Sequence, residues 1–302
     1  MQKDDLTKRY DNALQSFVDR IRNDPNVIAI IVYGSVSHGT VWEKSDIDMT
    51  VVVRDQKLEH KTYGIYEDNI LINLDLCQRS ELKRNMEKSL TGSVGHSFGA
   101  TSKVLYTTDE SLYEYFEEYK KIGKADVEKA LFEMINFLLG IMEKIEKWLV
   151  VKNDITYARY YILKAADVIA KIEVCSQYKV PTREAILQAN ELNPQLIEKF
   201  YYKPMITEMT QKQIYDLLVD MHDYIMKHFD AIINVATELF GDGEIKTGTH
   251  ISNYFKSSLH FLHPILDFLC DQGVLEKISQ TIRITPKSRP AVEEMAFIMP
   301  KL

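Results

Sequence analysis

The sequence has few cysteines and no long apolar run. Its three cysteines, Cys77, Cys175 and Cys270, are far apart and mostly have apolar neighbours, so they predict neither a disulfide framework nor a zinc site. A reduced, cytoplasmic compartment fits them best. The longest apolar runs, residues 27–33 and 137–142, are well short of the ~18 residues that a membrane span needs. Since the first residues also lack a signal-peptide pattern, we expect a protein that is neither secreted nor membrane-spanning.

A surplus of basic residues is also missing. The formal net charge is −7, whereas binding along nucleic acid without regard to its sequence requires a basic surface that neutralises several phosphates. Nucleic acid is therefore not an expected partner. The chain also lacks internal repeats and low-complexity segments. With 302 residues, 45% hydrophobic and 27% charged, it has the composition of an ordinary soluble protein of two or three domains.

The first part of the chain, residues 1–122, mixes helical and strand patterns. A helical pattern over 4–23 ends in turn-forming residues, and the β-branched runs 27–33 and 47–53 then predict two buried strands. Residues 70–77 alternate two sets of side chains and predict a third strand. These patterns favour an α/β domain with a small mixed sheet.

The pattern then becomes almost wholly helical. Apolar residues recur at helical spacing over 127–149, 157–178 and 211–240, which predicts a bundle of helices in a second domain, residues 123–241. The third domain, residues 242–302, shows two short helical patterns, two strand-like stretches and a final helical pattern. This order resembles a winged helix-turn-helix module. The expected fold class is therefore α+β, in three parts.

The charge of the third domain argues against a role in DNA binding. From Glu244 to Leu302 seven basic residues face six acidic ones, so the segment is nearly neutral. Its would-be recognition helix is dominated by apolar and acidic side chains, the reverse of what contacts to phosphates and base edges require. We expect this module to bind a partner or to cover a substrate.

Two aspartates stand where the second predicted strand begins, in the stretch SDIDM at residues 45–49. Because strand side chains alternate between the two faces of a sheet, Asp46 and Asp48 point the same way. Adjacent carboxylates repel each other unless a positive group lies between them, and Mg²⁺ prefers such oxygen ligands. Asp75 has the parity to complete a three-carboxylate site. The alternatives are that the pair only shapes a turn and that Asp75 is merely solvated.

A Gly-Ser turn closes the first predicted strand. Glycine at position 34 would let a phosphate approach the backbone closely, and the Ser35 hydroxyl and the turn amides can donate hydrogen bonds to it. A helix that starts near Ser35 would direct its positive end at the anion. The turn and the aspartates together suit phosphoryl or nucleotidyl transfer, where catalysis is mostly positioning and charge neutralisation.

The stretch GSVSHGTVWEKSDIDM, residues 34–49, resembles the signature of the polymerase-β nucleotidyltransferase superfamily, in which a Gly-Ser turn precedes an Asp-x-Asp pair at this spacing. The resemblance implies that Asp46 and Asp48 bind Mg²⁺, with two ions in all. It also implies that Gly34 and Ser35 hold the triphosphate of a nucleoside triphosphate, the donor substrate.

The same resemblance assigns a role to Asp75, and other features of the sequence indicate further site residues. Asp75 takes the third acidic position, where it ligates a metal or activates the acceptor hydroxyl. His38 stands in a segment where many members carry arginine, and we count it with Ser45 among the nucleotide-binding candidates. The Gly/Ser-rich segment 91–103 follows the core sheet, as substrate-lining loops do, which makes His96 and Ser97 candidates for acceptor contact. A surface connection without a role in binding is the alternative for this loop.

The order of the parts resembles the kanamycin-type nucleotidyltransferases, in which a helical bundle helps to bind the acceptor and two subunits pair. We therefore expect transfer of a nucleoside monophosphate to a hydroxyl of an unidentified acceptor, with a small molecule favoured, and a homodimer is compatible with this architecture. An inactive relative that binds nucleotide or a protein partner is the main alternative. An antitoxin-like enzyme that modifies a protein is another, although no fused toxin motif is visible in the helical part.

Overall fold

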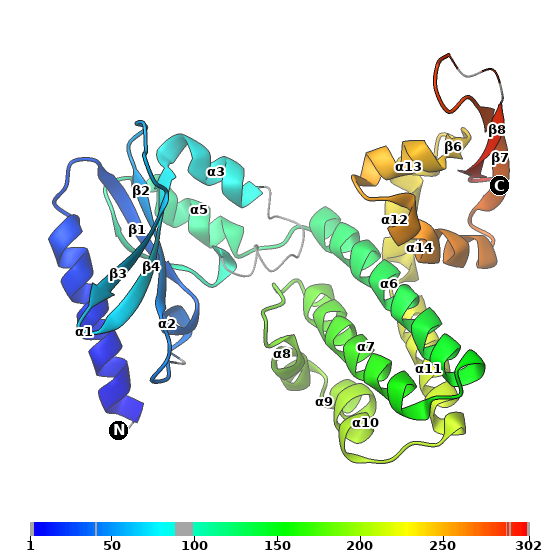
Figure 1. Ribbon diagram of the computed structural model, residues 1–302, viewed down its shortest axis with the longest axis horizontal. Coiled ribbons are helices and arrows are strands. Elements are labelled where there is room, and N and C mark those ends of the chain that lie inside the picture. Colours follow the sequence, from blue (N-terminus) through cyan, green and yellow to red (C-terminus); the bar gives the residue numbers. More distant parts are fainter. Residues whose placement is uncertain (1–2, 40, 88–98, 288, 290, 301–302) are drawn as a thin grey trace. The chain divides into compact units, whose positions relative to one another are not determined.

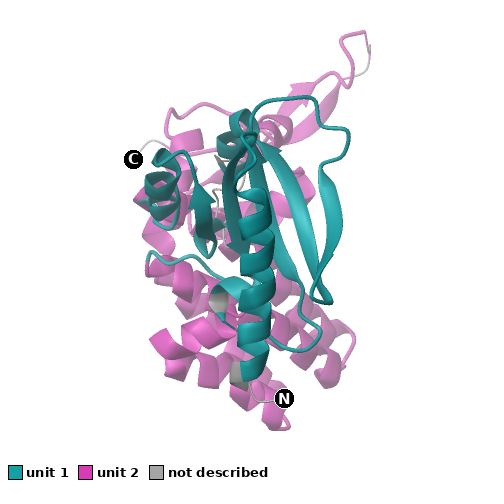
Figure 2. Cartoon of the chain, turned by 90° about the vertical axis from the view of Figure 1, so that its left-hand side faces the viewer, with its two compact units in different colours: residues 1–123, 178–183 teal, residues 124–177, 184–302 magenta. Residues whose placement is uncertain are grey.

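The computed structural model describes residues 3–39, 41–87, 99–287, 289 and 291–300. The chain divides into two compact units, coloured separately in Figure 2. Unit 1 comprises residues 1–123 and 178–183, and unit 2 comprises residues 124–177 and 184–302. The three-domain division, with boundaries at 122 and 241, stays a prediction. No helix of the described residues is both long enough and apolar enough to cross a membrane.

Unit 1 is built on a mixed five-stranded sheet in the order β3-β4-β2-β1-β5 (Figure 1). Its strands are β1 (Val27–Tyr33), β2 (Ile47–Val53), β3 (Thr62–Glu67), β4 (Ile70–Gln78) and β5 (Lys103–Thr107). Strands β2 and β4 are parallel, whereas the other neighbours are antiparallel. The mixed sheet confirms the predicted fold class. The edge strand β3 was not predicted, because most of its residues are exposed and show no apolar alternation.

Helices cover both faces of this sheet. Helix α1 (Lys3–Ile21) lies on one face, while α3 (Arg79–Glu87) and α5 (Ser111–Tyr119) lie on the other (Figure 1). Strand alternation divides β1 between them, because Ile30 and Val32 pack in the cluster with α1 and Ile31 packs in the cluster with α3 and α5. Each such fully buried aliphatic side chain contributes about 1.5–3 kcal/mol of transfer free energy.

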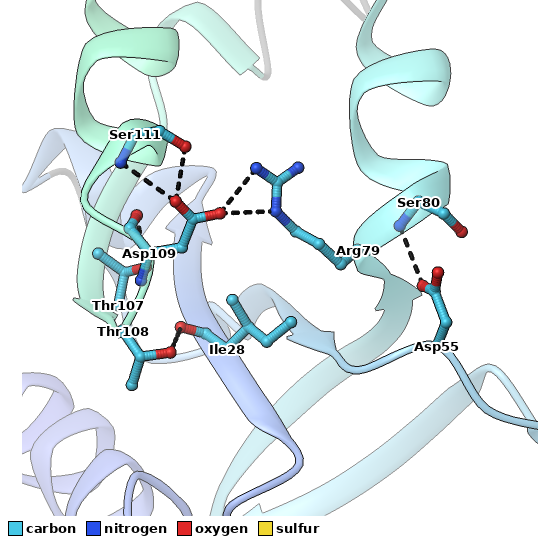
Figure 3. Close-up of polar contacts among 8 residues, drawn as sticks. All are labelled: Ile28, Asp55, Arg79, Ser80, Thr107, Thr108, Asp109 and Ser111. Atoms are coloured by element: carbon cyan, nitrogen blue, oxygen red, sulfur yellow. Dashed lines mark hydrogen bonds and ion pairs between the residues drawn. The ribbon is translucent and has the colours of Figure 1, made fainter.

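An ion pair holds the start of α3 against the start of α5 (Figure 3). Arg79 donates from Nε and Nη2 to Asp109 Oδ2, at 2.8 and 2.7 Å. The other carboxylate oxygen accepts the Ser111 backbone N–H and hydroxyl, at 3.2 and 2.6 Å. The hydrogen bond from the Ser111 side chain lowers the pKa of Asp109, and the hydrogen bond from Arg79 lowers it further. These contacts fix the two helices that also form one wall of the cavity beside the candidate site.

Unit 2 is mainly helical, as its apolar periodicity predicts. Its long helices are α6 (Lys124–Glu146), α7 (Ile155–Ser176), α11 (Gln211–Met226) and α12 (Phe229–Phe240). Its short helical segments are η1 (Lys147–Val151), α8 (Ala185–Leu192), α9 (Pro194–Ile197), η2 (Glu198–Tyr202) and α10 (Lys203–Ile206), of which η1 and η2 are π-helical. The single helix predicted over 211–240 is wrong. The His228 N–H bonds to the Ile225 carbonyl three residues back, and this tighter turn ends α11.

The last part of unit 2 contains β6 (Lys246–Thr247), α13 (Gly248–Phe255), α14 (Leu259–Asp271), β7 (Glu276–Ile282) and β8 (Val292–Ile298). The three strands form an antiparallel sheet in the order β6-β8-β7. The predicted final helix is wrong, since its segment forms β8, whose Ala296 and Phe297 are buried where β8 pairs with both neighbours. The winged-helix resemblance stays a prediction.

A polar side chain repairs an interrupted helix in unit 2. Pro264 lies inside α14, where proline removes a backbone donor and crowds the preceding turn. Asn136 of α6 bridges the gap, because its Nδ2 donates to the Phe261 carbonyl at 2.7 Å and its Oδ1 accepts the Ile265 N–H at 3.2 Å. The Asn136 amide thus replaces a helical hydrogen bond and ties α14 to α6.

Candidate active site

Strand β1 ends in a turn that requires glycine. Gly34 has φ 73° and ψ −152°, a backbone conformation that residues other than glycine rarely adopt. A Cβ at this position would lie 2.9 Å from Asp48 Oδ2. Helix α2 (Ser35–His38) follows at once, and the Ser37 N–H and hydroxyl both donate to the Gly34 carbonyl, at 3.1 and 2.8 Å. The Gly-Ser turn therefore lies directly against Asp48.

Asp46 and Asp48 share one hydrogen-bond donor. Strand register places Asn73 of β4 opposite Asp48 of β2. Asn73 Nδ2 donates to Asp46 Oδ2 at 2.6 Å and to Asp48 Oδ1 at 3.0 Å. Both carboxylates are half-buried, and among the described residues neither forms an ion pair with a basic side chain. Two negative groups are thus held together by a neutral amide.

Asp75 is held by other partners. It pairs with Thr50, two residues further along the β2–β4 ladder than the pair of Asp48 and Asn73. Tyr33 donates to Asp75 Oδ2 at 3.3 Å, and Thr62 Oγ1 donates to Asp75 Oδ1 at 3.1 Å. Burial, with a smaller effect of the Asp75 and Asp48 carboxylates, raises the pKa of Tyr33 to about 12. The Tyr33 hydroxyl therefore keeps its proton near neutral pH and acts as a donor to Asp75.

Asp75 is one of the residues that line a cavity of about 480 Å³ in unit 1. This volume is within the roughly 300–1,000 Å³ that is usual for small-molecule sites. Leu82 of α3 and Phe116 of α5 contribute apolar walls. Lys61 and Glu81, which form an ion pair at 2.9 Å, contribute charged groups. The cavity therefore joins a carboxylate and its hydrogen-bonded hydroxyls to an apolar surface, an arrangement suited to a small ligand with both kinds of group.

Of the remaining predicted site residues, the structure describes Ser45 in full but not the other three. Ser45 Oγ accepts the Trp42 N–H at 3.0 Å, and Tyr10 OH donates to the Ser45 carbonyl at 2.6 Å. Ser45 thus helps to shape the loop that delivers Asp46. The side chain of His38 lies outside the described part of the chain, as do residues His96 and Ser97.

Sequence reasoning missed two residues of this site. Asn73 and Tyr33 both lie on the face that carries Asp48 and Asp75, so their parity was readable from the sequence. Their partners were not readable, because partners depend on which strands are neighbours and in what register. Asn73 in particular lies 25 residues from Asp48 along the chain.

The donor set fits a hard cation. Among the described residues, no three side chains of His, Cys, Asp and Glu gather as a metal site. Two adjacent carboxylates with an amide beside them nevertheless supply the oxygen chemistry of Mg²⁺, which commonly takes one or two protein carboxylates together with substrate phosphates. Glycine at position 34 also lets the turn approach Asp48 closely, since a Cβ there would lie 2.9 Å from Asp48 Oδ2. Asp46 and Asp48 are the residues that could hold the ion.

A family model described as "Polymerase beta, Nucleotidyltransferase" matches residues 15–111. These residues span β1, the Gly34 turn, β2 and β4, and so include Asp46, Asp48, Asn73 and Asp75. The match confirms the resemblance that the Gly-Ser turn and the Asp-x-Asp pair indicate. No curated protein is similar enough in sequence to be matched to this chain.

Two solved structures resemble the chain to different degrees. A nucleotidyltransferase-like protein from Exiguobacterium sibiricum 255-15 has a TM-score of 0.66 at 13% identity, over 96% of this chain and 99% of that one. The two chains therefore share their fold over nearly the whole length. Spectinomycin adenyltransferase AAD(9) from Enterococcus faecialis, solved with ATP and spectinomycin, has a TM-score of 0.30 at 14% identity, over 74% of this chain and 98% of that one.

Proposed function

We propose that this chain, whose residues 15–111 form a nucleotidyltransferase domain of the polymerase-β type, transfers a nucleoside monophosphate from a nucleoside triphosphate to a hydroxyl of an acceptor. The observation that carries the proposal is the Gly34 turn in direct contact with Asp48, which lies beside Asp46. In-line displacement forms the bond from the acceptor oxygen to the α-phosphorus and breaks the bond from that phosphorus to the leaving pyrophosphate.

Asp46 and Asp48 hold Mg²⁺ in this proposal, and the superfamily resemblance implies two ions. When bound, the metal supplies charge neutralisation for the phosphates. The backbone amides and hydroxyl at Gly34 and Ser35 bind the triphosphate, supported by the close approach that glycine permits. Ser45 acts by shaping the loop before Asp46, and His38 is proposed as a further nucleotide contact.

Asp75 receives the acceptor proton in this proposal. It is exposed, lines the cavity and lies two residues along the ladder from the pair of Asp48 and Asn73. Tyr33 and Thr62 each donate to one of its oxygens, so they fix the orientation of the carboxylate while leaving lone pairs for a substrate hydroxyl. The volume of about 480 Å³ supports a small-molecule acceptor rather than a macromolecule.

The rest of the chain has supporting roles in the proposal. Residues 123–241 help to bind the acceptor, residues 91–103 contribute His96 and Ser97, and residues 242–302 form a winged-helix-like module that binds a partner or covers the substrate. A cytoplasmic location and a homodimer belong to the same proposal. Sedimentation of the purified chain tests the dimer directly, since a monomer at micromolar concentration contradicts it.

Calorimetric titration with ATP, GTP, CTP and UTP, with and without Mg²⁺, tests the nucleotide site. We expect Mg²⁺-dependent binding of at least one triphosphate, and loss of that binding in the double variant Asp46→Asn/Asp48→Asn. The matched control is Glu43→Gln, which removes an exposed carboxylate from the same loop. Transfer of label from an α-³²P-triphosphate to a panel of hydroxylated acceptors then measures turnover. Absence of both binding and turnover in a folded protein refutes the proposal.

A protein that binds nucleotide without turnover is a second candidate. The observation in its favour is the lack of a three-acid centre among the described residues, where Asn73 rather than an acid stands opposite Asp48. Metal-dependent triphosphate binding with no labelled product from any acceptor would select this candidate over the enzyme.

A further inference from the structure

Strand β4 presents two polar residues on the face of the sheet that carries Asp48. Asn73 pairs with Asp48 itself, and Asp75 pairs with Thr50, two residues further along the ladder. Mg²⁺ requires octahedral coordination, which two carboxylates do not complete by themselves, so a further oxygen ligand can come from a side chain that lies against both carboxylates. The register decides which of the two β4 residues lies there. The distances favour Asn73, whose Nδ2 lies 2.6 Å from Asp46 Oδ2 and 3.0 Å from Asp48 Oδ1.

We propose that Asn73, and not Asp75, is the β4 residue that completes the cation site of Asp46 and Asp48. The inference rests on the proposed function, because it concerns the same site. Ionised carboxylates only accept hydrogen bonds, so the amide must present its nitrogen to them in this arrangement. One neutral group thereby holds two mutually repelling carboxylates at one point and keeps them ready for a cation.

The chemistry of the amide suits this position. A primary amide has two N–H donors at one end and a carbonyl oxygen at the other, and hard divalent cations accept Asn carbonyl oxygens as ligands. Rotation of the side-chain amide exchanges the two ends, so in this proposal Asn73 donates to the carboxylates without the cation and turns its Oδ1 toward the cation when it binds. With Asn73 as its third member, the site without nucleotide has a formal charge of −2, which the first of the two proposed divalent cations neutralises. With Asp75 instead, the charge would be −3. If Asn73 is the third member, the Asp75 carboxylate remains available for the acceptor hydroxyl. Tyr33 and Thr62 already orient this carboxylate.

Binding of Mn²⁺ to the purified full chain without nucleotide separates the two β4 residues. We would measure it by the loss of the free-ion electron paramagnetic resonance signal and by calorimetry. Asn73→Leu should raise the Kd for Mn²⁺ by about 10–100-fold, the usual effect of losing a partner of metal-binding side chains. The matched control Asp75→Asn, on the same face of the same strand, should leave the Kd at its native value.

A second variant guards against a folding defect. Asn73→Asp is nearly isosteric, and it should lower the Kd for Mn²⁺ because it adds a third carboxylate at the site. Its melting temperature without metal should fall, owing to repulsion among three carboxylates, and should recover when Mn²⁺ is added. A residue with only a structural role would not give this recovery.

Three outcomes would overturn the inference. Native affinity in Asn73→Leu together with lost affinity in Asp75→Asn assigns the place to Asp75. Unchanged affinity in Asn73→Asp shows that position 73 does not face the ion. If the native chain itself binds no Mn²⁺, the cation site of the proposed function fails as well, whereas the first two outcomes leave that function intact.

Discussion

The chain surrounds half-buried carboxylates in two opposite ways. One case is the pair of Asp46 and Asp48 in unit 1, and the other is Glu173 in unit 2. Each oxygen of Glu173 on α7 has its own neutral donor, since Oε1 accepts Asn193 Nδ2 at 3.1 Å and Oε2 accepts Tyr224 OH at 2.8 Å. In unit 1, two carboxylates share the single amide of Asn73. The paired donors at Glu173 are typical of a structural network, while a crowded pair with one donor is suited to a ligand.

The backbone next to these two groups of carboxylates also differs in strain. Around Glu173 the partners are Tyr224 on α11 and Asn193, the N-cap of α9, and neither has a positive φ. Beside Asp48 the backbone of Gly34 adopts a conformation rarely open to other residues. Strain that is maintained at a polar site is often associated with function. Unit 2 should therefore respond to substitution through stability, and the Gly34 turn through binding and turnover.

The largest expected effect comes from Gly34→Ala. The new Cβ would lie 2.9 Å from Asp48 Oδ2 in a backbone conformation that disfavours it, so we expect turnover or nucleotide affinity to fall by about 100-fold. Kinetics and calorimetry measure the loss. Gly39→Ala is the matched control, because Gly39 also has a positive φ, of 69°, but a Cβ there would meet no described atom within 4 Å. Equal losses in both variants would show that strain alone matters and that contact with Asp48 does not.

Tyr224→Phe should act on stability instead. It removes the donor to Glu173 Oε2 inside the bundle, and a half-buried carboxylate that loses a donor costs about 1–3 kcal/mol in free energy of unfolding. Urea denaturation measures this change, and triphosphate binding should remain native. Tyr215→Phe, an exposed tyrosine on the same helix, serves as the control. A change in nucleotide binding without a change in stability would contradict the structural assignment of the Glu173 network.

His228 gives this network a dependence on pH. Burial, opposed by the Glu173 carboxylate and assisted by Lys227, lowers the pKa of His228 in the folded state. The unfolded chain therefore binds more protons between the folded pKa and the ordinary value near 6.5, and stability falls as the pH drops through that window. The slope for one proton is at most about 1.4 kcal/mol per pH unit.

Denaturation midpoints between pH 5 and pH 8 test the role of His228. The variant His228→Phe keeps a ring beside Tyr224, whose centroid lies 5.1 Å from that of His228, but it cannot be protonated. We expect its stability to vary less with pH than that of the native chain. An identical slope in the two proteins would show that other groups cause the dependence.

The smallest expected effect is that of Asp46→Asn/Asp48→Asn on stability. This double variant should lose metal-dependent nucleotide binding, yet its free energy of unfolding should lie within about 0.5 kcal/mol of the native value or above it. The reason is that it removes repulsion between carboxylates and breaks no ion pair among the described residues. A marked loss of stability, measured by the same urea titration, would show that the pair has a structural role, as we expect for Glu173.

Much of the sheet was predictable because its strands have strong local signals. The β-branched runs of β1 and β2 and the alternation in β4 lie within a few residues of the predicted bounds. Edge strand β3 and the break between α11 and α12 were missed, since an exposed strand lacks an apolar pattern and the break preserves one. The local pattern of β8 predicts a helix, but pairing with β6 and β7 overrides that pattern.

The sequence by itself determined the local chemistry of the site. The alternation of strand side chains makes Asp46 and Asp48 share a face, and the position of Gly34 at the end of β1 permits a turn that no other residue adopts readily. Only the tertiary structure decided that Asn73, and not Asp75, lies opposite Asp48. Both have the right parity, and a register shift of two residues would exchange them opposite Asp48. That register depends on pairing and packing between strands distant in sequence, which parity within one strand cannot specify.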